Sequence, residues 1–316
     1  MKLLITDFAW PDLSIEQQLL EEAELDFVVS DSQDEETLAA LASDVHGIMT
    51  CWAPVTRHVI ESSPNCKVVS RMGIGLDNID IDTCNELKIP VTNVPDYCLI
   101  EVAEHAIASI LTLGRNLHDF HTKSKQGIYS RNAITPLKRL EGRTVGVVGL
   151  GHIGKTVVKK ASALGFKVLG TRNDLSKPVD GCHVVALDQL LSHSDFITLH
   201  LPLTDTNHHM ISDKEFGMMK DGSFLINTAR GGLIDHEALG RALDSGKIAG
   251  AALDVQDPEP PDLLQPLMQD PRVLISPHAA FVSEESLVDL RIRATQNAIG
   301  VITGQNVANI VNKGCF

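Results

Sequence analysis

Residues 144–154, TVGVVGLGHIG, run from a β-branched strand pattern directly into three glycines spaced G-x-G-x-x-G. A helical stretch and a second strand follow over 155–170, which is the sequence context of a dinucleotide site. Gly149 permits the tight turn, Gly151 lets a pyrophosphate approach the backbone, and Gly154 lets the helix pack closely on the strand. The helix N-terminus directs N–H groups at the phosphates. This segment predicts an α/β fold that binds a dinucleotide.

Short β-branched runs alternate with stretches of helical period along most of the chain, the rhythm of a parallel sheet covered by helices. The length of 316 residues is about twice that of an ordinary domain. We therefore predict two Rossmann-like, doubly wound α/β domains. The expected strands are 2–5, 26–29, 45–49 and 67–71 in a first series, with helices over 14–23 and 35–41, and 144–148, 167–170, 196–199, 223–227, 249–253 and 273–275 in a second series.

Two long helical patterns bracket the second series. Apolar residues recur at helical spacing over 99–117, and a second pattern follows Ser283, which has the character of an N-cap with two acids after it. The chain is expected to leave its first domain, build a second, and return, so that the tail over 306–311 completes the first. We predict a discontinuous substrate domain (1–98 and 285–316), a dinucleotide domain (99–284) and a cleft between them.

Charge and composition exclude several classes of protein. Lys and Arg number 27 against 41 Asp and Glu, a formal net charge of −14, which disfavours a sequence-independent nucleic-acid binder. No apolar stretch is long enough to span a bilayer, and Asp7 interrupts the first apolar run too early for a signal peptide. The six cysteines are scattered without metal-site spacing. We expect a cytoplasmic protein with no membrane partner and no metal.

The residue at the end of the second strand of the dinucleotide unit bears on the choice of cofactor. NAD-binding proteins usually place an acid there, whereas this strand ends Gly-Thr171-Arg172. An arginine can pair with the 2′-phosphate of NADP, so Arg172 favours NADP. In the alternative interpretation Arg172 is a solvated turn residue, Asp174 takes the ribose, and the cofactor is NAD.

Three later segments carry side chains that hydride chemistry could use. Each follows a predicted strand, at the sheet edge where open α/β folds bind ligands. They are 226–232 (INTARGG), 252–260 (ALDVQDPEP) and 275–280 (ISPHAA).

In combination with the glycine loop, these segments resemble the D-isomer-specific 2-hydroxyacid dehydrogenases, a family of glyoxylate and hydroxypyruvate reductases, phosphoglycerate dehydrogenase and D-lactate dehydrogenase. The resemblance covers essentially the whole chain, including segments 71–80, 91–95 and 102–105. It implies that Arg230 holds the substrate carboxylate and polarises the keto oxygen. His278 would be the acid and base for that oxygen, and Glu259 would hydrogen-bond and orient its imidazole.

The resemblance also implies a cofactor site and a substrate site. Asp254 would contact the nicotinamide carboxamide, and the amides of the loop at residues 73–75 would take the substrate carboxylate. The expected cofactor residues are Gly149, Gly151, His152, Ile153, Gly154, Thr171, Arg172, Pro202, Thr206, Thr228, Ala229, Arg230, Asp254, His278 and Ala280. The expected substrate residues are Trp52, Met72, Gly73, Ile74, Gly75, Arg230 and His278, with Trp52 either walling the pocket or packing in the core.

Departures from the family pattern bear on the substrate. Thr50 and Cys51 occupy the place of an Arg-Ser pair that phosphoglycerate-specific relatives carry, so a small unphosphorylated acid such as glyoxylate or hydroxypyruvate is favoured. 3-Phosphoglycerate and D-lactate remain alternatives. A corepressor-like protein that senses the dinucleotide is the alternative of another class. The segment 115–140 resembles an arm that relatives exchange in a dimer, which predicts a homodimer.

The remaining histidines are weaker candidates. His105 is expected to cap or pack within its helix, and His152 to flank the pyrophosphate. The adjacent pair His208 and His209 lacks the usual ligand partners of a metal site in the sequence.

Overall fold

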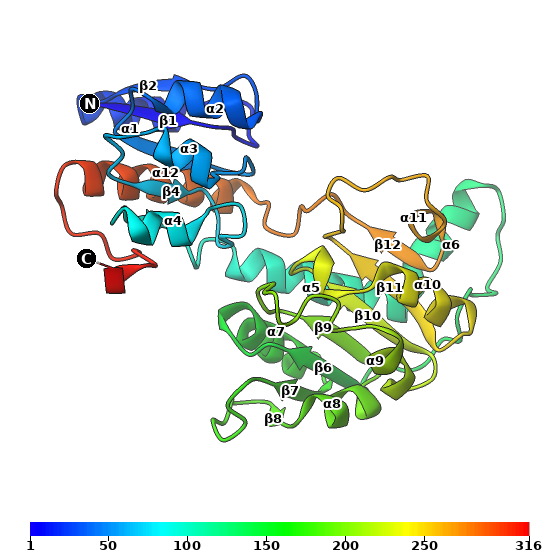
Figure 1. The fold of residues 1–316 in the computed structure, drawn as a ribbon. Helices are drawn as coiled ribbons and strands as arrows, with labels where there is room; N and C mark the ends of the chain where they lie inside the picture. Colours follow the sequence, from blue (N-terminus) through cyan, green and yellow to red (C-terminus); the bar gives the residue numbers. More distant parts are fainter. Residues whose placement is uncertain (316) are drawn as a thin grey trace. The chain divides into compact units, whose positions relative to one another are not determined.

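The computed structural model describes residues 1–315. Internal contacts divide the chain into two compact units (Figure 1). Unit 1 combines Met1–Tyr97 with the residues from Ser283 onward, and unit 2 is the continuous segment Cys98–Val282. Both units are α/β, each with one parallel sheet, so the predicted fold class of two Rossmann-like domains is confirmed.

Unit 1 contains a five-stranded parallel sheet in the order β2-β1-β3-β4-β5. Alternate residues of β1 enter two different cores: Leu3 and Ile5 pack with α1 and α12, whereas Leu4 packs with α2, α3 and α4. The bounds are β1 Lys2–Ile5, α1 Ser14–Glu22, β2 Asp26–Val29, α2 Glu35–Ala42, β3 Gly47–Thr50, α3 Arg57–Glu61, β4 Val69–Arg71, α4 Ile81–Glu86, β5 Val91–Thr92, α12 Glu284–Ile302 and a 3-10 turn, η2, Lys313–Cys315.

The last part of the chain is built into unit 1 (Figure 1). Helix α12 begins with the predicted cap, since the Ser283 hydroxyl accepts a hydrogen bond from the Ser286 amide at 2.9 Å. Its Arg291 forms a buried ion pair with Glu16 of α1, Nη2 to Oε2 at 2.7 Å. The tail then forms hydrogen bonds with β5, where the Val311 amide donates to the Val91 carbonyl at 2.9 Å. Both ends of the sequence therefore contribute to one core.

Unit 2 contains a seven-stranded parallel sheet in the order β12-β11-β10-β9-β6-β7-β8. One apolar core lies beneath α8–α10 and the other beneath α5 and α7, so helices cover both faces. The bounds are α5 Leu99–Gly114, α6 Leu117–Lys125, β6 Thr144–Val148, α7 His152–Ala163, β7 Lys167–Thr171, β8 His183–Val184, α8 Leu187–His193, β9 Phe196–Leu199, α9 Asp213–Met218, β10 Ser223–Asn227, η1 Gly231–Leu233, α10 His236–Asp244, β11 Ile248–Leu253, α11 Pro266–Gln269 and β12 Val273–Ile275.

The strand order of unit 2 reverses at β6, which has β7 on one side and β9 on the other. In open α/β sheets this reversal opens a crevice at the carboxyl ends of the strands, where ligands bind. The glycine loop leaves β6 at that point. The fold thus places the predicted dinucleotide segment at the usual ligand position of such a sheet.

The helix predicted over 99–117 is shorter in the structure. Helix α5 ends at Gly114, and Asn116 then adopts a left-handed conformation with φ of 53° before α6 begins. The side chain of Asn116 is buried and exchanges hydrogen bonds with Thr135 at 2.8–3.2 Å, which fixes this break through a contact distant in sequence.

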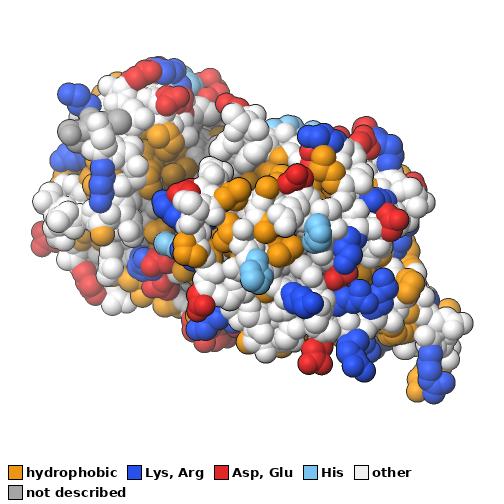
Figure 2. Space-filling model, turned by 90° about the horizontal axis from the view of Figure 1, so that it is seen from below, with side chains coloured by type: hydrophobic (Ala, Val, Ile, Leu, Met, Phe, Trp, Pro, Cys, Tyr) orange, Lys and Arg blue, Asp and Glu red, His pale blue; other side chains and the backbone are white. Residues whose placement is uncertain are grey.

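No helix among residues 1–315 is both long and apolar enough to cross a membrane. Figure 2 shows one face of the molecule, on which acidic, basic and histidine side chains are interspersed with apolar ones.

Candidate active site

The three side chains singled out as catalytic follow three neighbouring strands of unit 2. Arg230 follows β10, Glu259 follows β11 and His278 follows β12, and β11 pairs with both of the others in parallel register. Because parallel strands end at the same edge, the loops that carry these residues lie side by side.

His278 and Glu259 are in direct contact. The imidazole Nδ1 lies 2.7 Å from Oε1 of the carboxylate, and the His278 side chain is 18% exposed against 37% for Glu259. The carboxylate accepts a hydrogen bond from Nδ1–H, which orients Nε2 as the ring nitrogen that would exchange a proton. The ring also meets Phe281 edge-on, at 6.1 Å between centroids. The pair is therefore oriented from two sides while part of the ring stays accessible.

Asp254 holds the loop that carries His278. Its carboxylate accepts hydrogen bonds from the Ser276 hydroxyl at 2.6 Å and from the amides of Ala279 and Ala280, both at 2.9 Å. The His278 amide donates to the Asp254 carbonyl at 2.7 Å, and His278 itself has a φ of 52°. A left-handed conformation is costly for a non-glycine residue and persists where its surroundings enforce it. Asp254, expected at the nicotinamide, is 2% exposed and acts on this loop.

His105 extends the same network from α5. Its Nε2 lies 3.0 Å from the Ser276 hydroxyl, which in turn donates to Asp254. His105 was predicted only to cap or pack within its helix, and Ser276 was not predicted as a site residue. Because 171 residues separate the two, no local pattern could have linked them.

The Arg230 loop is fixed by a buried amide and by a close backbone contact. The Asn227 side chain, fully buried, accepts from the Ala229 amide at 3.0 Å and donates to the Arg230 carbonyl at 2.8 Å. A Cβ atom at Gly231 would lie 2.0 Å from the carbonyl carbon and oxygen of Gln256. Only glycine can occupy this position without displacing backbone. Gly231 therefore lets the Arg230 loop lie against the turn that leads to Glu259.

The glycines of the dinucleotide loop differ in their surroundings. Gly149 has a φ of 97°, and a Cβ there would lie 2.2 Å from the His200 carbonyl oxygen. A Cβ at Gly154 would lie 1.9 Å from the Gly149 carbonyl oxygen. At Gly151, by contrast, a Cβ would meet nothing within 4 Å, and this exposed residue begins α7 without a side-chain cap. Two glycines thus close the turn, and the third leaves open space at a helix N-terminus.

That arrangement fits the phosphates of a dinucleotide. The 12-residue helix α7 presents uncapped amides, with exposed His152 and half-buried Ile153 in its first turn. Thr228 follows β10. Its hydroxyl is buried and has no hydrogen-bond partner in residues 1–315, so a bound ligand can supply the missing hydrogen bond.

His200 lies beside the glycine turn at the end of β9. Its Nε2 is 2.8 Å from the Thr198 hydroxyl. Burial lowers the pKa of His200 to about 3, because a buried imidazole resists taking up charge. His200 is therefore a neutral hydrogen-bonding group in this wall of the site.

At the end of β7 the structure distinguishes Arg172 from Asp174. Oδ1 of Asp174 accepts from the hydroxyl and amide of Ser176 at 2.6 and 3.1 Å, and Lys177 lies 3.3 Å from Oδ2. The hydrogen bonds from Ser176, aided by Lys177 and Arg172, hold the pKa of Asp174 below its usual value. The Asp174 carboxylate is therefore bound by residues of its own turn. Half-buried Arg172 directly follows Thr171, whose carbonyl accepts from the Gly149 amide at 3.0 Å.

The other predicted cofactor residues lie at the same edge of unit 2. Pro202 and Thr206 are exposed in the loop after β9, where Asn207 donates to the Pro202 carbonyl at 2.8 Å. Ala229 is half-buried, and Ala280 is buried with its amide on Asp254.

The predicted substrate residues outside the Arg230 and His278 loops belong to unit 1. Met72 is buried, and the carbonyls of Gly73 and Ile74 are held by the Val94 amide at 3.0 Å and the Asn93 side chain at 2.8 Å. Gly75 is half-buried in the same loop. Trp52 is 37% exposed, with the Arg71 guanidinium 5.6 Å from its ring centroid, so it is a surface residue and not part of the core.

Comparison with known proteins connects this arrangement to one family. Residues 107–280 match the model of the NAD-binding domain of D-isomer-specific 2-hydroxyacid dehydrogenases. A D-3-phosphoglycerate dehydrogenase of Methanocaldococcus jannaschii is 36% identical over 316 residues, which cover 99% of this chain and 59% of that relative. The chain thus spans about three fifths of the length of this curated relative.

Solved structures resemble the whole chain. A glyoxylate reductase from Paecilomyes thermophila has 29% identity and a TM-score of 0.89, with 99% of this chain and 98% of that chain covered. A D-lactate dehydrogenase from Aquifex aeolicus, solved with NAD and lactic acid, has 31% identity and a TM-score of 0.87, with 98% of both chains covered.

Proposed function

Because this chain belongs to the D-isomer-specific 2-hydroxyacid dehydrogenase family, we propose that it interconverts a small 2-keto acid and the D-2-hydroxy acid with a nicotinamide cofactor. The observation that carries the proposal is the 2.7 Å contact of His278 Nδ1 with Glu259, on loops adjoining the Arg230 loop. An imidazole that is oriented by a carboxylate, with an arginine on a neighbouring loop, suits protonation of an oxyanion.

Each of the three side chains has a distinct task. The cofactor supplies or accepts the hydride. Arg230 binds the substrate carboxylate through its planar fork and polarises the keto oxygen. His278 delivers a proton to that oxygen from Nε2, and in the reverse direction removes it. Glu259 accepts from Nδ1–H and keeps the ring in that orientation.

The edge where the glycine loop leaves β6 would hold the cofactor. The α7 N-terminus and Gly151 would receive its phosphates, and the Thr228 hydroxyl would supply a further polar contact. Arg172 favours NADP over NAD, because a guanidinium pairs with a 2′-phosphate and Asp174 is already engaged by Ser176 and Lys177.

The substrate is a small unphosphorylated acid such as glyoxylate or hydroxypyruvate. Thr50 is fully buried and donates to the Ala53 carbonyl at 2.8 Å, and Cys51 is 2% exposed, so neither presents a donor to a phosphate. The carboxylate-binding role of residues 73–75, with Met72 and Trp52 as neighbours, rests on the family resemblance. The 36% identity to a D-3-phosphoglycerate dehydrogenase favours 3-phosphoglycerate as the second candidate.

The protein is a cytoplasmic homodimer in this proposal. Apolar side chains exposed in and after α6 support the assembly, among them Leu117 at 56% and Tyr129 at 95% exposure. Light scattering coupled to gel filtration measures the mass directly, and the mass of a single chain at micromolar concentration would refute the dimer.

A kinetic panel tests the function. Glyoxylate, hydroxypyruvate, pyruvate and 3-phosphohydroxypyruvate are each assayed with NADH and with NADPH by loss of nicotinamide absorbance. We expect turnover of an unphosphorylated acid, faster with NADPH, and the D-isomer of any product that is chiral, such as glycerate from hydroxypyruvate. Cofactor binding without turnover of any acid would favour the sensing function, and no cofactor binding would overturn the proposal.

A further inference from the structure

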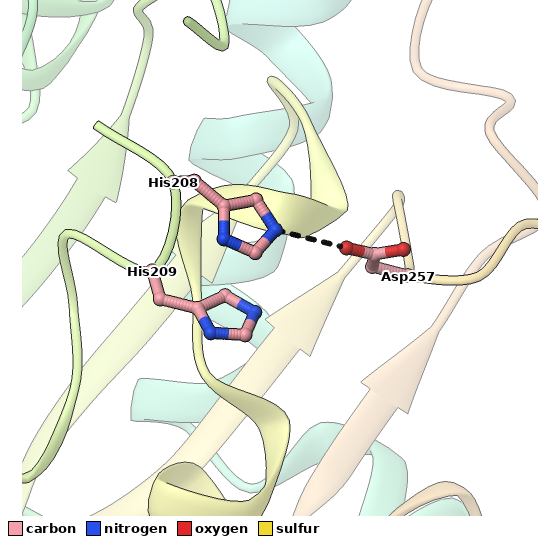
Figure 3. A group of neighbouring side chains, drawn as sticks. All are labelled: His208, His209 and Asp257. Atoms are coloured by element: carbon pink, nitrogen blue, oxygen red, sulfur yellow. Dashed lines mark ion pairs between the residues drawn. The ribbon is translucent and has the colours of Figure 1, made fainter. Parts of the chain in front are cut away.

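We propose that His208, His209 and Asp257 bind a divalent transition-metal ion of the Zn²⁺ class at the surface of unit 2 (Figure 3). Each residue offers one ligand atom, and these atoms all lie within 4.8 Å of one another. The two histidines come from the loop after β9 and the aspartate from the loop after β11. In the sequence the histidine pair lacks a partner, and the fold supplies one from 48 residues beyond His209.

The spacing of the ligand atoms is close to that of a metal site. His208 Nε2 lies 3.6 Å from Oδ2 of Asp257, as the dashed line in Figure 3 marks. Two ligands at about 2.1 Å from a tetrahedral ion lie roughly 3.4 Å apart. The two imidazoles stack at 3.9 Å between centroids with 26° between planes. Because all three side chains are exposed, they can rotate to bring the three ligand atoms around one ion.

The backbone beneath these side chains is already fixed. The His209 amide donates to the Gly232 carbonyl at 2.7 Å, and the Ile211 amide donates to the Leu233 carbonyl at 3.0 Å. A Cβ at Gly232 would lie 3.2 Å both from Oδ2 of Asp257 and from Cδ2 of His208. Glycine at this position therefore lets the two ligand residues approach each other. Because the backbone is already ordered, metal binding costs little conformational entropy there.

The donor set selects the class of ion. Two imidazole nitrogens and one carboxylate oxygen suit Zn²⁺, Co²⁺, Ni²⁺ or Cu²⁺, whereas Mg²⁺ and Ca²⁺ prefer oxygen ligands alone. All three residues are exposed, so water completes the coordination sphere.

Zinc binding to the untagged full chain tests the site. A competition titration against a chromophoric chelator is run on the wild type and on His208→Ala and Asp257→Asn. We expect one equivalent of Zn²⁺ on the wild type and at least about tenfold weaker binding in each variant, because one of three ligands is lost. The matched control is His58→Ala, which removes an exposed histidine that lies 3.4 Å from Glu36 in unit 1. This control binds as the wild type does.

Co²⁺ provides an independent readout. Binding at this site gives visible d–d bands without a thiolate charge-transfer band, which separates it from binding at the cysteines. Circular dichroism of the metal-free variants checks that they fold. Absence of stoichiometric binding, wild-type affinity in folded His208→Ala and Asp257→Asn, or a thiolate band would each overturn the proposal. None of these outcomes depends on dehydrogenase activity.

Discussion

Nδ1 of His278 lies 2.7 Å from Oε1 of Glu259, and the two residues come from loops that follow adjacent parallel strands. The contact is local to unit 2, so one rigid sheet edge sets its geometry. Functional groups on a rigid edge hold their relative positions better than groups on a free loop.

Replacement of His278 by alanine removes the proton donor and leaves the glycine loop, Arg172 and Thr228 in place. Turnover should fall by about 10²–10⁴-fold, and the dissociation constant for the nicotinamide cofactor should change by less than about threefold. Steady-state kinetics and cofactor fluorescence titration measure the two effects. An equal loss in both would contradict the acid–base role.

Glu259→Gln keeps a hydrogen-bonding group beside Nδ1 but removes the negative charge. The amide can also hold the ring in the opposite tautomer, so kcat should fall by at least about tenfold with a smaller change in KM. A full pH profile of kcat/KM for both proteins provides the check. Identical profiles and rates would mean that Glu259 is only a surface carboxylate.

Gly231→Ala should damage both stability and turnover. The new Cβ would lie 2.0 Å from the Gln256 carbonyl, so backbone must shift at a cost of about 1–3 kcal/mol, or several degrees in Tm. Gly240→Ala, in α10, is the matched control, because a Cβ there meets nothing within 4 Å. The control should match the wild type or exceed it slightly. Equal Tm values for the two variants would refute the contact.

Gly151→Ala should separate ligand binding from folding. Its φ of −74° is open to alanine and its Cβ has free space, so Tm should stay within a degree or two of the wild type. The methyl group would occupy the path of the pyrophosphate and weaken cofactor binding by about tenfold or more. Calorimetric titration with NADH and NADPH measures this. Unchanged affinity would place the phosphates elsewhere.

The lowered pKa of the His200 imidazole predicts a pH dependence of stability. Its pKa in the folded protein is about 3, and an unfolded histidine titrates near 6.5. The unfolded chain therefore takes up the proton first, and stability falls as pH decreases from about 6.5 towards 3, by at most about 1.4 kcal/mol per unit. Urea unfolding at pH 7, 6 and 5 should show a weaker loss in His200→Gln. His183→Gln, at an exposed histidine of β8, should follow the wild type.

Regular periodicity made most of the fold predictable. Most strands of both sheets, and the cap at Ser283, follow from patterns within a few residues. Strands β5 and β8 were not predicted, because two residues carry no recognisable period. The break between α5 and α6 was not predicted either, because it depends on the hydrogen bond between the side chains of Asn116 and Thr135.

The candidate site divides in the same way. Arg230, Glu259 and His278 were proposed because the segments that carry them resemble those of a known family, and the structure brings Glu259 and His278 into contact. The support of the His278 loop by Asp254, the contact from His105 to Ser276 and the approach of Asp257 to His208 join distant segments. Such contacts arise from tertiary packing, so no local pattern encodes them.

The buried ion pair of Glu16 with Arg291 has a consequence for biosynthesis. A ribosome releases the first of these residues 275 positions before the second, and all of unit 2 emerges in between. The sheet face of unit 1 that α12 covers therefore stays uncovered until α12 has been synthesised. Unit 2 can fold during translation, whereas unit 1 can be completed only after α12 has left the ribosome.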